Sequence, residues 1–87
     1  MSDPDRRFAE TVPVWTGGHI RMIGSAREAA ETLLYRWPDG PETRKRRAAR
    51  EAALKALEGR ATAEVARKAL IAAAKEDRIY MAGVRAK

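Results

Sequence analysis

The chain has 87 residues, 45% of them hydrophobic, no cysteine and a formal net charge of +6. A chain of this length forms one domain that buries only about 60 to 65% of its unfolded surface, so a deep, enclosed active site is not expected. Without cysteine there are no disulfides, thiolate zinc sites or thiol nucleophiles, and without an apolar run near the roughly 18 residues that span a bilayer we expect a cytoplasmic protein with no membrane partner.

Residues 1–10 are polar and are predicted to be a flexible leader. The next segment, TVPVWTGGHIRMI, places β-branched residues on both sides of Gly17-Gly18, which predicts a β-hairpin. A three-residue loop would pair Val14 with Ile20 and gather four aliphatic side chains on one face, and we favour this register. A two-residue turn would pair Trp15 with Ile20 instead, because a slip of one residue exchanges the two faces.

A first helix is predicted to begin after Ser25, because Ser25 and Glu28 form a capping box. Six apolar residues then follow at the spacing of one helix face, namely Ala26, Ala29, Ala30, Leu33, Leu34 and Trp37. Pro38 is expected to end this helix. The pattern predicts that Trp37 lies in the core.

Two further helices are predicted in the second half of the chain. Pro41 suits the first position of one helix and Gly59 its C-terminal stop, while Thr62 caps the next helix, which extends to about Glu76. The short run Ile79–Met81 alternates as a strand does, so it is expected either to add a third strand or to pack as a tail. The prediction is therefore one α+β domain over residues 11–81, with an N-terminal β-hairpin, three α-helices and residues 82–87 as a C-terminal tail.

The order of these segments is distinctive. It runs from the Gly-Gly hairpin through REAAETLLYRWP at 27–38 to a basic, alanine-rich helix that ends in ALEG at 56–59, and then to EVARKALIAAAKE. Over residues 11–81 this order resembles a small bacterial family known as domain of unknown function 982. The resemblance implies an α+β fold with a hairpin ahead of the helices. It implies no activity and no catalytic residues.

Groups that converge for catalysis are not evident in the sequence. His19 is the only histidine and lies beside a glycine turn, where its ring would be exposed. Glu28 is used by the capping box, and Gly17-Gly18 lacks the strand-to-helix context of a phosphate loop. We therefore expect no catalytic residues, no cofactor, no metal site and no small-molecule substrate.

The basic segment PETRKRRAAR is the main candidate site. Residues 1–40 contain five basic and six acidic side chains, whereas residues 41–87 contain thirteen and six. Cations near a helix N-terminus oppose the helix dipole, so Glu42, an acidic partner or a bound anion should offset them. The candidate residues for binding an anion or a partner are Arg44, Lys45, Arg46, Arg47 and Arg50, and we favour Arg46 and Arg50 because they border the apolar face.

Trp15 and Tyr35 lie off the predicted apolar faces and are candidate exposed aromatic contacts. The sequence favours a small non-enzymatic binding or regulatory module whose partner is another protein or a second copy of the chain. The alternative is nucleic-acid binding through the basic helix within residues 41–58.

Overall fold

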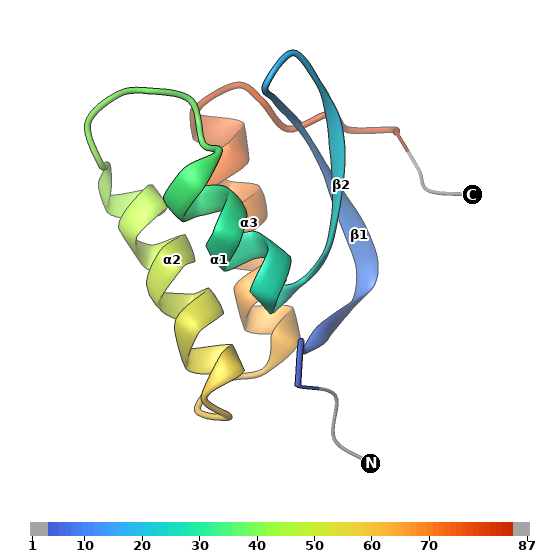
Figure 1. The fold of residues 1–87 in the computed structure, drawn as a ribbon, viewed down its shortest axis with the longest axis vertical. Coiled ribbons are helices and arrows are strands. Elements are labelled where there is room, and N and C mark those ends of the chain that lie inside the picture. The colour runs from blue at the N-terminus through green and yellow to red at the C-terminus, as the bar shows by residue number, and fades with distance from the viewer. Residues whose placement is uncertain (1–3, 85–87) are drawn as a thin grey trace.

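The computed structural model describes residues 4–84 and shows a β-hairpin followed by three helices (Figure 1). The elements in chain order are β1 (Arg7–Thr16), β2 (His19–Ser25), α1 (Ala26–Tyr35), α2 (Arg44–Leu57) and α3 (Ala63–Glu76). The predicted α+β fold is confirmed.

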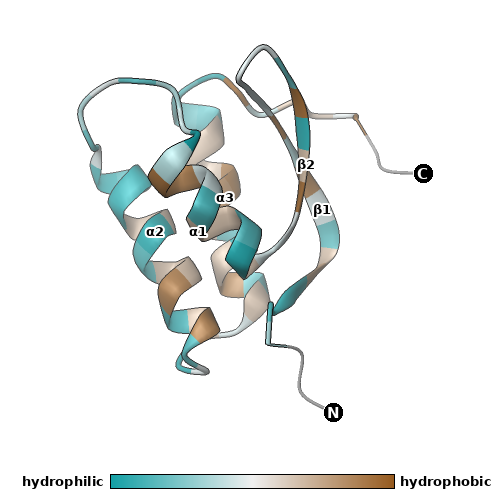
Figure 2. Cartoon of the chain, in the orientation of Figure 1, coloured by the Kyte–Doolittle hydropathy of each residue, from teal (hydrophilic) through white to brown (hydrophobic). Residues whose placement is uncertain are grey.

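The hairpin lies on one side of the helices, with β2 against α1 and β1 against α3, and α2 packs on α1 and α3 away from it (Figure 1). The largest fully buried aliphatic side chains are Val12, Val14, Ile23 and Leu70. Alanines fill most of the remaining core, so the helices approach closely and each contact buries little area. Hydropathy varies along α2: its first turns are hydrophilic, and leucines occur near its C-terminal end (Figure 2).

The hairpin has the two-residue turn, and the register favoured from the sequence is wrong. Trp15 pairs with Ile20, and Val12 pairs with Ile23. Gly17 and Gly18 have φ values of 64° and 84°, so both adopt the left-handed conformation that a two-residue turn of this twist requires. Ile20 therefore lies on the opposite face of the hairpin from Val12.

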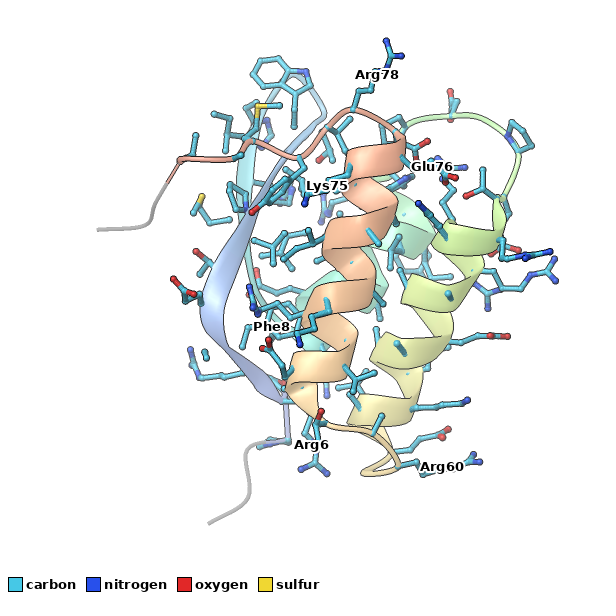
Figure 3. The ribbon with its side chains drawn as sticks, turned by 180° about the vertical axis from the view of Figure 1, so that it is seen from behind. Arg6, Phe8, Arg60, Lys75, Glu76 and Arg78 are labelled. Carbon is cyan, nitrogen blue, oxygen red and sulfur yellow. The ribbon has the colours of Figure 1, made fainter. Side chains whose placement is uncertain are left out.

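The folded domain begins earlier than predicted. β1 starts at Arg7, and Phe8, which is 8% exposed, lies between β1 and α3 (Figure 3). The carbonyl groups of Asp5 and Arg6 accept hydrogen bonds from the backbone N–H groups of Arg27 and Ala26, at 3.3 and 3.0 Å. Residues 5–10 thus belong to the fold rather than to a leader, while residues 1–3 lie outside the described part of the chain.

Ser25 caps α1 as predicted, because its hydroxyl oxygen accepts a 3.1 Å hydrogen bond from the N–H of Glu28. The helix ends at Tyr35 rather than Trp37, and Leu34, which the sequence placed on the apolar face, is exposed. Thr32 is buried instead. α1 packs against both β2 and α2, so its buried sector includes Thr32, and Leu34 lies about 100° around the helix from Leu33.

The ends of α2 and α3 follow the predicted signals, with one change. α2 begins at Arg44 rather than near Pro41, because the Thr43 side chain accepts a hydrogen bond from the N–H of Arg46 and caps the helix there. Gly59 follows α2 with a φ of 79°. Thr62 caps α3 as predicted.

Residues Ile79–Met81 run beside β1 without forming a strand. Val14 and Tyr80 form an isolated antiparallel bridge, flanked by hydrogen bonds of 2.8 Å from Trp15 N to Ile79 O and 2.9 Å from Met81 N to Pro13 O. Within residues 4–84 the sheet therefore has two strands, with one edge of β1 covered by this bridge. Of the predicted tail, residues 85–87 lie outside the described part of the chain.

Candidate functional site

Arg46, one of the two favoured arginines, binds groups within its own chain. Its side chain is 12% exposed, and its Nε lies 3.2 Å from Oδ2 of Asp77, within ion-pair distance although the N–H is not aligned for a hydrogen bond. Its guanidinium also donates to the backbone carbonyls of Pro38, Gly40 and Pro41. Arg46 thus holds the loop between α1 and α2 in place.

Two more hydrogen bonds join the C-terminal end of α3 to its neighbours. Trp37 Nε1 donates a 2.6 Å hydrogen bond to Oδ2 of Asp77, the C-cap of α3. Thr43 Oγ1 donates a second 2.6 Å hydrogen bond to Glu76. Trp37 packs partly buried against the core, as predicted. These bonds connect the end of α1, the start of α2 and the end of α3.

Glu42 offsets part of the positive charge at the start of α2. Its Oε1 lies 2.9 Å from Nη2 of Arg50, and its Oε2 lies 3.4 Å from Nε of Arg47. The hydrogen bond from Arg50 is the main cause that lowers the pKa of the Glu42 carboxyl below its ordinary value of 4.5. Glu42 therefore pairs with Arg47 and Arg50 within the chain, although the sequence also allowed an external acidic partner or a bound anion for these arginines.

The remaining two candidates are exposed. Within residues 4–84, Arg44 and Lys45 form no ion pair or side-chain hydrogen bond. A shallow depression of about 210 Å³ lies at this end of the molecule, and its lining includes Leu33, Trp37, Arg46 and Arg50. The five predicted residues thus separate into three that have internal carboxylate partners and two that face solvent.

The hairpin presents an apolar outer face, the side turned away from the helices. Trp15 is 47% exposed and its cross-strand neighbour Ile20 is 40% exposed. Pro13 and Met22 form the next pair on this face, where Pro13 is buried and Met22 is partly exposed. Tyr35, the second predicted aromatic contact, is 79% exposed but lies at the end of α1 rather than on the hairpin.

One edge of β2 has backbone groups that bond to no other group of residues 4–84. Thr16 and His19 flank the two-residue turn, so residues 19, 21 and 23 bond to β1, and Ile20 and Met22 direct their N–H and C=O groups away from it. No hydrogen bond to these four groups occurs within residues 4–84. Gly24 differs, because its N–H donates a 3.2 Å hydrogen bond to Oε1 of Glu28. The open edge therefore extends over Ile20–Met22.

Arg21 lies between these two residues, on the helix-facing side with Val14. Its Nε is buried and has no hydrogen-bond partner in the described part of the chain, and its Nη2 lies 3.4 Å from Nε2 of His19. No acidic side chain within residues 4–84 forms an ion pair with it. The sequence reasoning missed Ile20, Arg21 and Met22 as a group, because the favoured register placed Ile20 and Met22 in the core.

Residues 4–84 contain no group of three or more His, Cys, Asp or Glu side chains that could hold a metal ion. No helix among them has the length and apolar composition needed to cross a lipid bilayer.

The fold defines a small α+β domain with an N-terminal hairpin and an open sheet edge. Residues 11–81 match the model of a family described as "Protein of unknown function (DUF982)", and the chain belongs to this family. No curated protein and no solved structure matches the chain.

Proposed function

We propose that this protein is a small non-enzymatic binding module that recognises another protein through its hairpin. The exposed, cross-strand pair Trp15 and Ile20 carries this proposal. Large apolar side chains that stay exposed side by side on a small domain are typical of interaction surfaces, and tryptophan is enriched among residues that dominate binding energies.

A site-specific crosslink tests the proposal. A photoreactive phenylalanine analogue replaces Trp15 in one variant and Leu54, an exposed residue of α2 on the far side of the molecule, in a control variant. We expect a discrete adduct with a second protein from position 15 and not from position 54 after irradiation of the source cells. Identical adducts from both positions, or none from position 15, would contradict the proposal.

Nucleic-acid binding through α2 has less support. Arg46, Arg47 and Arg50 already have carboxylate partners, so of the five candidates only Arg44 and Lys45 pair with no carboxylate of residues 4–84. Two phosphate contacts would give a log affinity that falls with log salt at a slope of about −1.8 on duplex DNA. Titration of labelled DNA at two salt concentrations measures that slope, and Arg44→Ala/Lys45→Ala should flatten it if α2 binds the backbone.

A further inference from the structure

The open edge of β2 is already shaped to receive an extended chain. Ile20 and Met22 direct four backbone groups outward, and a strand laid antiparallel along them would form four hydrogen bonds and become a third strand of the sheet. The other sheet edge is occupied by the bridge between Val14 and Tyr80. β2 is therefore the edge at which a partner strand can add.

The side chains around this edge specify what such a strand should carry. Residues opposite Ile20 and Met22 would extend the apolar outer face from β2 onto the added strand, so apolar side chains fit there. The residue between them would lie directly opposite Arg21, in the non-hydrogen-bonded type of pair, in which side chains approach most closely. Arg21 has no acidic partner within residues 4–84, so a carboxylate fits this position.

We propose, resting on the proposed function, that β2 binds an extended segment of a partner protein with the alternating pattern apolar, acidic, apolar, centred on Arg21. The pattern combines the three features of the edge: outward backbone groups at Ile20 and Met22, apolar neighbours on the outer face, and, on the other face, an arginine that pairs with no carboxylate of residues 4–84.

A second copy of the chain fits this edge less well. Two β2 strands paired about Arg21 would place this residue against its own copy, and like charges directly opposite each other are destabilising. Pairing about Met22 instead would place Ile20 opposite Gly24 of the second copy, whose N–H is already bonded to Glu28. Charge and hydrogen bonding therefore both favour a different chain with a central acid.

Two synthetic peptides test this pattern, acetyl-Thr-Val-Glu-Val-Thr-amide and the same peptide with lysine at its centre. We titrate each into the full-length, 15N-labelled protein and follow the backbone amides by NMR. The glutamate peptide should shift the amides of Ile20 and Met22 most and slow their hydrogen exchange. It should bind about fivefold more tightly than the lysine peptide, the ratio expected for one cross-strand charge pair.

Two variants separate the side-chain and backbone contributions. Arg21→Glu should reverse the preference, so that the lysine peptide binds more tightly. Met22→Pro removes one outward N–H and should abolish binding of both peptides. It removes no bond to β1, because the N–H of Met22 points away from its cross-strand neighbour Pro13. Thermal unfolding of each variant shows whether it is folded. If Met22→Pro does not fold, the reversed peptide preference of Arg21→Glu still tests the proposal.

Several results would overturn the strand addition. It is rejected if the peptide shifts amides centred elsewhere than Ile20 and Met22, or if both peptides bind with equal affinity. It is also rejected if, without peptide, a concentration-dependent dimer protects the amides of Ile20 and Met22 from hydrogen exchange. No binding of either peptide, with the crosslink from position 15 intact, would reject strand addition and leave the proposed function standing. Loss of that crosslink as well would reject both.

Discussion

The indole of Trp37 and the carboxylate of Asp77 are 40 residues apart and joined by a 2.6 Å hydrogen bond. The same oxygen of Asp77 lies 3.2 Å from Nε of Arg46. One carboxylate at the end of α3 thus contacts a residue at the end of α1 and a residue near the start of α2. Because alanine-rich helices bury little area per contact, this polar connection is expected to matter for the stability of the helical layer.

We expect Asp77→Ala to lower the free energy of unfolding by about 1 to 3 kcal/mol, since it removes the acceptor of the Trp37 N–H and the carboxylate that pairs with Arg46. Urea unfolding measures this change. In a double-mutant cycle with Trp37→Phe, the two effects should be less than additive, because both remove the same bond. Full additivity would show that the bond contributes nothing to stability.

The ends of α2 and α3 offer a matched pair of substitutions. Gly59 and Arg78 occupy equivalent positions after their helices, with φ values of 79° and 61°. Gly59→Ala should destabilise the protein by about 1 kcal/mol, whereas Arg78→Gly should stabilise it by up to about 1 kcal/mol, because only glycine adopts this conformation without strain. Thermal unfolding of both variants checks the opposite signs, and a shared sign would contradict the argument.

The carboxyl group of Glu42 should show a lowered pKa in an NMR titration, because Arg50 and then Arg47 hydrogen-bond its ionised form. A folded-state pKa below the unfolded value means that this stabilisation is present above the ordinary value of 4.5 and is lost as the pH falls through the lower, folded pKa. The stability difference between the wild type and Glu42→Gln should therefore shrink in acid. Arg50→Met should raise the pKa of Glu42; an unchanged pKa would assign the shift to another cause.

Phe8→Ala should destabilise the domain by about 3 kcal/mol, the loss typical of a buried aromatic side chain. The reason is that Phe8 belongs to the hydrophobic core, although it lies in a segment whose composition indicates a leader. Chemical unfolding measures the loss, with Ala9→Ser, at an exposed neighbouring position, as the control. Equal stabilities of the two variants would place Phe8 outside the core.

Several features of the fold follow from local chemistry, and the sequence predicts them for that reason. Ser25 and Thr62 cap helices because their hydroxyl oxygens accept from N–H groups three residues later. Gly59 ends α2 because it adopts a positive φ. The order of hairpin and helices depends on these short-range signals and on apolar periodicity, and it matches the structure.

The hairpin register was decided by tertiary structure. Both registers place Val12 and Val14 on the face that packs against the helices, and they differ in which residues of β2 share that face. With the two-residue turn, Ile23 joins Val12 in the core, and Ile20 and Met22 turn outward beside Arg21. The candidate strand-binding edge was therefore not predictable from these residues alone.

By itself, the sequence determined the fold class, the family resemblance and the helix caps at Ser25 and Thr62, because these depend on short-range signals along the chain. Tertiary structure decided the partners of the charged side chains. The runs of arginine in α2 suggest one basic surface, but Asp77 and Glu42 reach Arg46 and Arg50 from another helix end and from the preceding loop. Ion pairs form wherever the fold brings charges within a few ångströms, and for Arg46 and Asp77, which are distant in the sequence, only the three-dimensional packing sets that distance.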